Sequence, residues 1–189
     1  RSFLRQDPEV LLIGEIRDRN TADIAIKASL TGHLVLSTLH TNDAVATVTR
    51  LINMGIAPYL ISASLELVVA QRLLRKICPN CKALHPNQEE QTEQAKFMYG
   101  GNFQGSHIAF HQGAGCEACN FTGYKGRIAI YEMFSPSDAA KGLITAGANY
   151  AALYEQAKSD GLYTLIDDAV RLVAEGTTSL SEVIRVLSS

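Results

Sequence analysis

Two apolar segments joined by one helical segment constrain the fold of this 189-residue chain more than any other feature. EVLLIG (residues 9–14) reads as a strand buried on both faces, and HLVLSTLH (residues 33–40) reads as a second strand. NTADIAIKASLTG between them is typical of a helix that ends at Gly32, with Asn20 or Thr21 as its N-cap. A connection of this length allows a right-handed crossover, which predicts parallel strands and an α/β fold.

Later segments divide the chain into three regions. After a predicted helix NDAVATVTRLINMG with Asn42 as its cap, YLISASLELVVAQRLLRKI predicts one long amphipathic helix over 59–77. A cysteine-containing region with a polar insert and the strand GRIAIYEMF follows. The remainder is predicted to be helical, with a capping box formed by Ser179 and Glu182. The expected regions are 1–76, 77–134 and 135–189.

The composition fits an ordinary globular protein and excludes some classes. Hydrophobic residues make up 47% of the chain and charged residues 19%, and the formal net charge is −2. That charge gives no global basic field for nucleic acid or an anionic membrane. No apolar run approaches the roughly 20 residues of a bilayer span, and no signal peptide opens the chain. The start RSFLRQDPEV lacks an initiator Met and reads as mid-helix, so we expect a piece of a longer protein.

An acid and an imidazole follow the two predicted strands. Glu15 comes just after the first strand, and Thr38 and His40 end the second. Because ligands bind beyond the carboxyl ends of parallel strands, both groups should reach one crevice. An acid there can hold the water shell of Mg²⁺ or orient water for attack on a phosphate. A solvated turn in which the acid pairs locally is the alternative, and the residues alone leave both open. His33, at the entry of the second strand, reads as structural by the same reasoning.

The four cysteines form two C-x-x-C pairs, which predict a metal site. Each pair places two sulfurs on one tight turn, and two such turns complete a tetrahedron around Zn²⁺. A redox pair is the alternative, although two pairs in one region favour a metal. Four thiolates fill the shell, so the nearby histidines are expected at the surface. The predicted ligands are Cys78, Cys81, Cys116 and Cys119, and the histidines are His85, His107 and His111.

Several motifs resemble the secretion ATPase superfamily that powers type II secretion and type IV pilus assembly. RQDPEVLLIGEIRD resembles its Walker B segment, and TGHLVLSTLHTNDA resembles its histidine box. AQRLLRKICPNCK, GCEACNFTGYKGRIAIYE and the helical tail are similar to its assembly branch, which carries a tetracysteine zinc module. The resemblance implies a partial RecA-like P-loop NTPase core, a small zinc-binding subdomain and a helical carboxyl-terminal subdomain.

The same resemblance implies roles for single residues. Glu15 would be the catalytic Walker B acid, and His33 and His40 would be the two box histidines near the nucleotide. The arginines that would reach phosphates, within or across a hexamer, are Arg1, Arg5 and Arg17. Arg1 and Arg5 stand four apart, which places both on one helical face. A solvated helix face is the alternative for that pair.

A phosphate-binding loop is missing from these residues. No G-x-x-x-x-G-K-[ST] sequence occurs in the 189 residues, so the backbone cradle, its Lys and its Mg²⁺-binding hydroxyl are absent. We expect the chain alone neither to bind ATP tightly nor to hydrolyse it. ATP and Mg²⁺ would belong to the longer protein, with Zn²⁺ on the cysteines.

Three functions compete. The first is the carboxyl part of a hexameric motor, which the resemblance places in the cytoplasm, held at the inner membrane by a platform protein and other secretion or pilus machinery. The second is a non-catalytic zinc-bearing module that docks on such a platform protein. The third, nucleic-acid binding, is disfavoured because GYKGR and LLRKICPNCK lack interleaved aromatic residues. Secretion and pilus assembly stay unresolved. The four cysteines favour both over retraction, whose motors usually lack this module.

Overall fold

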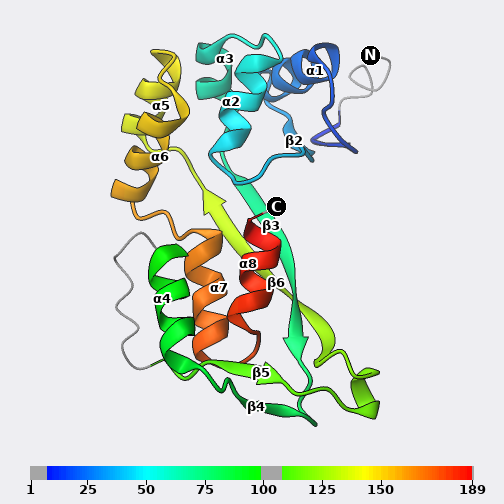
Figure 1. Cartoon of the computed structure of the whole chain (residues 1–189). Coiled ribbons are helices and arrows are strands. Elements are labelled where there is room, and N and C mark those ends of the chain that lie inside the picture. Colours follow the sequence, from blue (N-terminus) through cyan, green and yellow to red (C-terminus); the bar gives the residue numbers. More distant parts are fainter. Residues whose placement is uncertain (1–7, 99–107, 189) are drawn as a thin grey trace. The chain divides into compact units, whose positions relative to one another are not determined.

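The computed structural model describes residues 8–98 and 108–188, which form two compact units of mixed α/β structure (Figure 1). The first unit comprises Arg1–Ala70 and Met133–Leu162, and the second comprises Gln71–Glu132 and Tyr163–Ser189. The expected α/β class is confirmed. The expected helical tail is divided, since its first two helices belong to the first unit and its last two to the second.

A parallel strand pair with a crossover helix opens the first unit, as predicted. Strand β1 (Val10–Ile13) pairs with β2 (Leu34–Ser37) in parallel, and α1 (Arg19–Leu30) connects them. The predicted cap of α1 is wrong, because the helix begins earlier and Asp18 caps it. The Asp18 carboxylate accepts from the Thr21 N–H at 3.0 Å and from the Thr21 hydroxyl at 2.9 Å.

The prediction that the first strand is buried on both faces is wrong. Its alternate residues are exposed, and Leu12 keeps 79% of its surface accessible. The facing residues Leu34 and Leu36 on β2 are also exposed. Within the described residues the sheet has two strands, and α1 packs against β2, so only one face is covered.

Four more helices complete the first unit. They are α2 (Ala46–Asn53), α3 (Pro58–Ser64), α5 (Asp138–Thr145) and α6 (Tyr150–Ser159). Helix α3 packs against α1, α2 and α5 around the fully buried Ile61. The predicted cap Asn42 is wrong, because the helix starts further along the chain. Asp43 lies nearer to this start, and its carboxylate accepts from the Ala46 N–H at 2.7 Å.

The predicted long helix over 59–77 is also wrong. Helix α3 ends at Ser64, and the rest of the segment forms β3 (Val68–Ile77), which pairs with β6 (Tyr124–Phe134). Residues such as Leu, Gln and Arg suit a helix locally. Pairing with a strand about fifty residues later overrides that preference here.

The second unit packs helices beside two small sheets. Strands β4 (Lys82–Leu84) and β5 (His111–Gly113) are antiparallel. Figure 1 shows α4, α7 and α8 side by side, and α8 contacts both of the others. Their bounds are Gln88–Met98 for α4, Leu165–Ala174 for α7 and Leu180–Leu187 for α8, and the short helix η2 covers Glu117–Cys119. The buried core includes Leu74, Phe110, Ile130, Leu172 and Val183.

At the start of α8, one of the two hydrogen bonds of the predicted capping box is present. Ser179 accepts from the Glu182 N–H at 3.2 Å, as expected. The Glu182 carboxylate instead accepts from the N–H of Arg75 at 3.0 Å.

Among the helices that the structure describes, none combines the length and apolar character that a bilayer span requires.

Candidate functional site

Glu15, Arg17 and His40 meet beyond the carboxyl ends of β1 and β2. Arg17 Nε donates to Glu15 Oε2 at 2.5 Å, and His40 Nε2 lies 3.2 Å from the same oxygen. The structure therefore brings together the acid and the imidazole that two separate sequence motifs supply. It also contains the local ion pair between Glu15 and Arg17 that a solvated turn would form. A shared crevice and local pairing of the acid are therefore compatible.

Backbone bonds hold the two strand ends together under this cluster. The N–H of Ile16 donates to the carbonyl of Thr38 at 2.9 Å. The Thr38 hydroxyl donates to the carbonyl of Gly14 at 2.8 Å. Because these bonds flank Glu15 on both sides, the direction of its side chain is tied to the register of the sheet.

The cluster is open to solvent and anionic at Glu15. The hydrogen bond from Arg17 lowers the pKa of the Glu15 carboxyl; burial opposes this shift, and the contact with His40 adds to it. The side chains of Arg17 and His40 are 71% and 78% exposed. An ionised carboxylate beside an accessible imidazole can orient water or the hydrated shell of a cation.

Of the other predicted residues of the nucleotide site, the structure describes His33 and places it away from this cluster. His33 precedes β2, at the opposite end of the parallel pair, where its Nδ1 lies 3.0 Å from the carbonyl of Ala28. The four-residue strand between the two ends is about 13 Å long. Arg1 and Arg5 lie outside the described residues.

The four cysteine sulfurs form one compact cluster in the second unit. All lie within 4.8 Å of one another. Three separations are 3.9 Å for Cys78–Cys116, 3.9 Å for Cys81–Cys119 and 3.8 Å for Cys116–Cys119. A tetrahedral Zn²⁺ with Zn–S bonds of about 2.3 Å requires sulfurs about 3.8 Å apart. These three separations match that geometry, and the cluster is compatible with a zinc ion.

The pKa values of two cysteine thiols, one from each turn, are shifted in opposite directions. Burial alone would raise the pKa of the Cys119 thiol. The N–H groups of Cys116 and Gly123 donate to its sulfur, each at 3.3 Å, and the pKa falls to about 6. Burial and the neighbouring sulfurs raise the pKa of Cys81 to about 12. A bound cation would stabilise all four thiolates together.

The histidines near the cysteines are not among the ligands of the cluster that the structure describes. His85 and His111 are half-buried rather than fully at the surface, and the buried Nδ1 of His111 has no hydrogen-bond partner among the described residues. His107 lies outside the described residues. Gly113 and Gly123 were not identified from the sequence as residues that support the cysteine cluster. Their positions on either side of the second cysteine pair were a visible signal.

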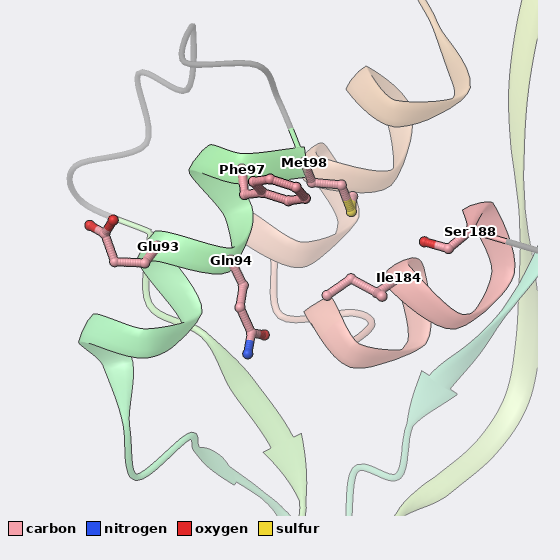
Figure 2. Close-up of a pocket in the computed structure, with 6 residues that line it drawn as sticks. All are labelled: Glu93, Gln94, Phe97, Met98, Ile184 and Ser188. Carbon is pink, nitrogen blue, oxygen red and sulfur yellow. The ribbon is translucent and has the colours of Figure 1, made fainter.

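An apolar groove of about 590 Å³ lies between α4 and α8 (Figure 2). Phe97 and Met98 face it from α4, and Ile184 faces it from α8. Of the predicted site residues that the structure describes, none lines it.

Comparison with known proteins identifies the kind of protein that this chain resembles. The sequence model of a family described as "Type II/IV secretion system protein" matches residues 1–185. The type IV pilus assembly ATPase PilB of Myxococcus xanthus is 48% identical over 190 residues, covering 97% of this chain and 32% of that protein. The type II secretion system ATPase E of Vibrio cholerae is 46% identical over 186 residues, covering 98% and 36%. The chain thus spans about a third of the length of these relatives.

Solved structures agree on the fold. The pilus retraction motor PilT with bound ADP aligns with a TM-score of 0.66 at 25% identity, covering 98% of this chain and 41% of that one. The ATPase DotB of Yersinia pseudotuberculosis aligns with a TM-score of 0.65 at 19% identity, covering 99% and 39%, and supports the fold alone. These matches confirm the family resemblance and the fold class predicted from the sequence.

Proposed function

Because this chain belongs to the type II/IV secretion system protein family, we propose that it is the carboxyl-terminal part of an ATP-hydrolysing motor for type II secretion or type IV pilus assembly. The observation that carries the proposal is the 3.2 Å approach of His40 Nε2 to Glu15 Oε2. Two strand ends deliver these groups to one edge of a parallel sheet, where nucleotides bind in α/β folds.

The proposed chemistry is phosphoryl transfer to water. Glu15, kept ionised by Arg17, orients the attacking water, and His40 contacts the γ-phosphate. When bound with the nucleotide, Mg²⁺ neutralises phosphate charge, and the Glu15 carboxylate is the group here that would hold its water shell. His33, Arg1 and Arg5 remain predicted contributors to the nucleotide site or to a subunit border.

The four cysteines are proposed to hold a structural Zn²⁺. Their sulfur separations match a tetrahedral thiolate site, and thiolate ligands favour zinc. A structural zinc stabilises a region with little core of its own.

The setting of the motor is also a proposal. Its hexameric state, its cytoplasmic location at the inner membrane and its docking on a platform protein rest on the family resemblance. The 189 residues alone are expected to be inactive, because no phosphate-binding loop occurs among them.

The test is ATP hydrolysis by the full-length protein carrying Glu15→Gln. We expect a loss of turnover of about a hundredfold or more, because the amide cannot accept a proton or orient water as the carboxylate does. Glu9→Gln is the matched control, since Glu9 is an exposed acid just before the same strand. Retained turnover in Glu15→Gln would remove Glu15 from the mechanism.

A second function is favoured by the cysteine cluster. It forms within the second unit and shares no residue with the Glu15 cluster, as a non-catalytic docking module requires. A full-length protein that binds zinc and its membrane machinery, yet hydrolyses no ATP under any condition tested, would support this module instead of the motor.

A further inference from the structure

Two glycines, one on each side of the second cysteine pair, let the segments that lead into and out of that pair cross in direct contact. A Cβ on Gly113 would lie 2.0 Å from the carbonyl oxygen of Gly123, and a Cβ on Gly123 would lie 2.5 Å from that of Gly113. Real Cβ atoms do not approach backbone atoms so closely. Both positions therefore exclude any side chain while this crossing is kept.

The peptide groups of Gly123 bond to both cysteine pairs. Its N–H donates to the Cys119 sulfur at 3.3 Å. Its carbonyl accepts from the N–H of Cys78 at 2.9 Å. Gly123 adopts a φ of +77°, a left-handed conformation that favours glycine. One residue thus links a sulfur of the second pair to the backbone of the first.

The strand on the other side of the crossing is tied to the first pair as well. Gly113 pairs with Lys82, which follows Cys81 directly, and the next residue, Ala114, donates its N–H to the carbonyl of Cys81 at 2.9 Å. The crossing therefore fixes how far apart the two cysteine turns lie.

We infer that Gly113 and Gly123 are positioning residues for the metal, setting the separation of the sulfurs although neither binds the ion. The inference rests on the proposed zinc site. Groups that orient ligands commonly change metal affinity by about 10–100-fold. An added methyl at either position forces the two segments apart and stretches the four-sulfur cluster.

The experiment measures zinc affinity of the 189-residue chain by competition with a chromogenic chelator. We expect Gly113→Ala and Gly123→Ala each to weaken zinc binding about tenfold or more, although all four sulfurs remain. With Co²⁺ in place of zinc, the absorption bands of a tetrahedral thiolate site should weaken or shift in both variants. This spectroscopic change reports the geometry at the ion rather than general stability.

Gly126→Ala is the matched control. Gly126 also has a left-handed φ, of +81°, and lies three residues from Gly123, but its added Cβ would meet only the Lys76 Cδ at 4.0 Å. It should cost backbone strain and leave zinc affinity and the Co²⁺ spectrum unchanged. Gly126→Ala tests left-handed backbone strain without a clash. Gly113→Ala tests the reverse, since it introduces a clash at a residue without a left-handed φ.

The outcomes separate this inference from the proposed zinc site. If the unaltered chain binds no zinc, the zinc site itself is overturned. If it binds zinc and folded Gly113→Ala and Gly123→Ala bind equally well, the positioning role is overturned. Circular dichroism checks folding. Variants that fold only in excess zinc support the inference, whereas variants that stay unfolded in saturating zinc overturn it, since the crossing then serves the fold rather than the ion.

Discussion

Three hydrogen bonds between Arg75 and Glu182 join strand β3 to helix α8. Glu182 accepts from the Arg75 N–H at 3.0 Å and from its guanidinium at 2.9 and 2.6 Å. The Glu182 side chain is fully buried, and Arg185 donates to both of its oxygens at 2.8 and 2.7 Å. A buried carboxylate with this many donors is costly to disrupt, because the remaining partners lose their counter-charge.

Glu182→Gln should destabilise the chain by about 3 kcal/mol, because the amide removes the charge that two guanidiniums share. Chemical denaturation followed by circular dichroism measures the change. Glu175→Gln is the control, since Glu175 forms a solvent-exposed pair with Arg171 and should cost less than about 1 kcal/mol. Equal effects of the two substitutions would contradict a special role for the buried carboxylate.

Stability should also fall in acid through Glu182. Burial would raise the pKa of this carboxyl, but Arg185 and Arg75 hold it at about 2, below its ordinary value of 4.5. A lowered pKa stabilises the folded state above the unfolded value, so the contribution is complete above pH 4.5. It is lost as the pH falls towards 2, by about 3 kcal/mol. Denaturation midpoints of the wild type and Glu182→Gln should therefore converge across this range, and a constant gap between them would refute the assignment.

Local patterns predicted much of the structure. The strand–helix–strand segment near the start and the helices ending at Gly32, Gly161 and Gly176 were read from short-range signals and are present. The sulfur cluster was likewise predictable, since C-x-x-C spacing fixes each pair and a metal site needs two.

Long-range relationships were the part that local patterns could not supply. Strand β3 looks helical because its strand character comes from pairing with β6. Glu182 looked like the second half of a capping box, but a partner 107 positions away takes its carboxylate.

Metal removal should loosen the second unit selectively. The N–H of Ile77 donates to the carbonyl of Thr177, and the Tyr124 hydroxyl lies 2.6 Å from that of Ser179, so the strands next to the cysteines are tied to the segment between α7 and α8. Treatment with a strong zinc chelator should lower the melting temperature and speed amide exchange at Ile77 and Cys78. Exchange at Ile16 in the first unit is the internal control. Uniform acceleration in both units would contradict a local structural role for the metal.

Arg17 lowers the pKa of the proposed catalytic acid, Glu15. Its hydrogen bond is the largest influence that lowers the pKa of Glu15, so Arg17→Ala should raise that pKa towards 4.5. Carboxyl-carbon NMR titration of the 189-residue chain measures the change directly. Lys27→Ala is the matched control, because it removes an exposed cation paired with Asp23 on the neighbouring helix. Since the ionised acid is the form that orients water, the acid limb of ATP hydrolysis by full-length Arg17→Ala should move to higher pH in parallel. An unchanged pKa of Glu15 in Arg17→Ala would show that the contact with Arg17 does not lower that pKa.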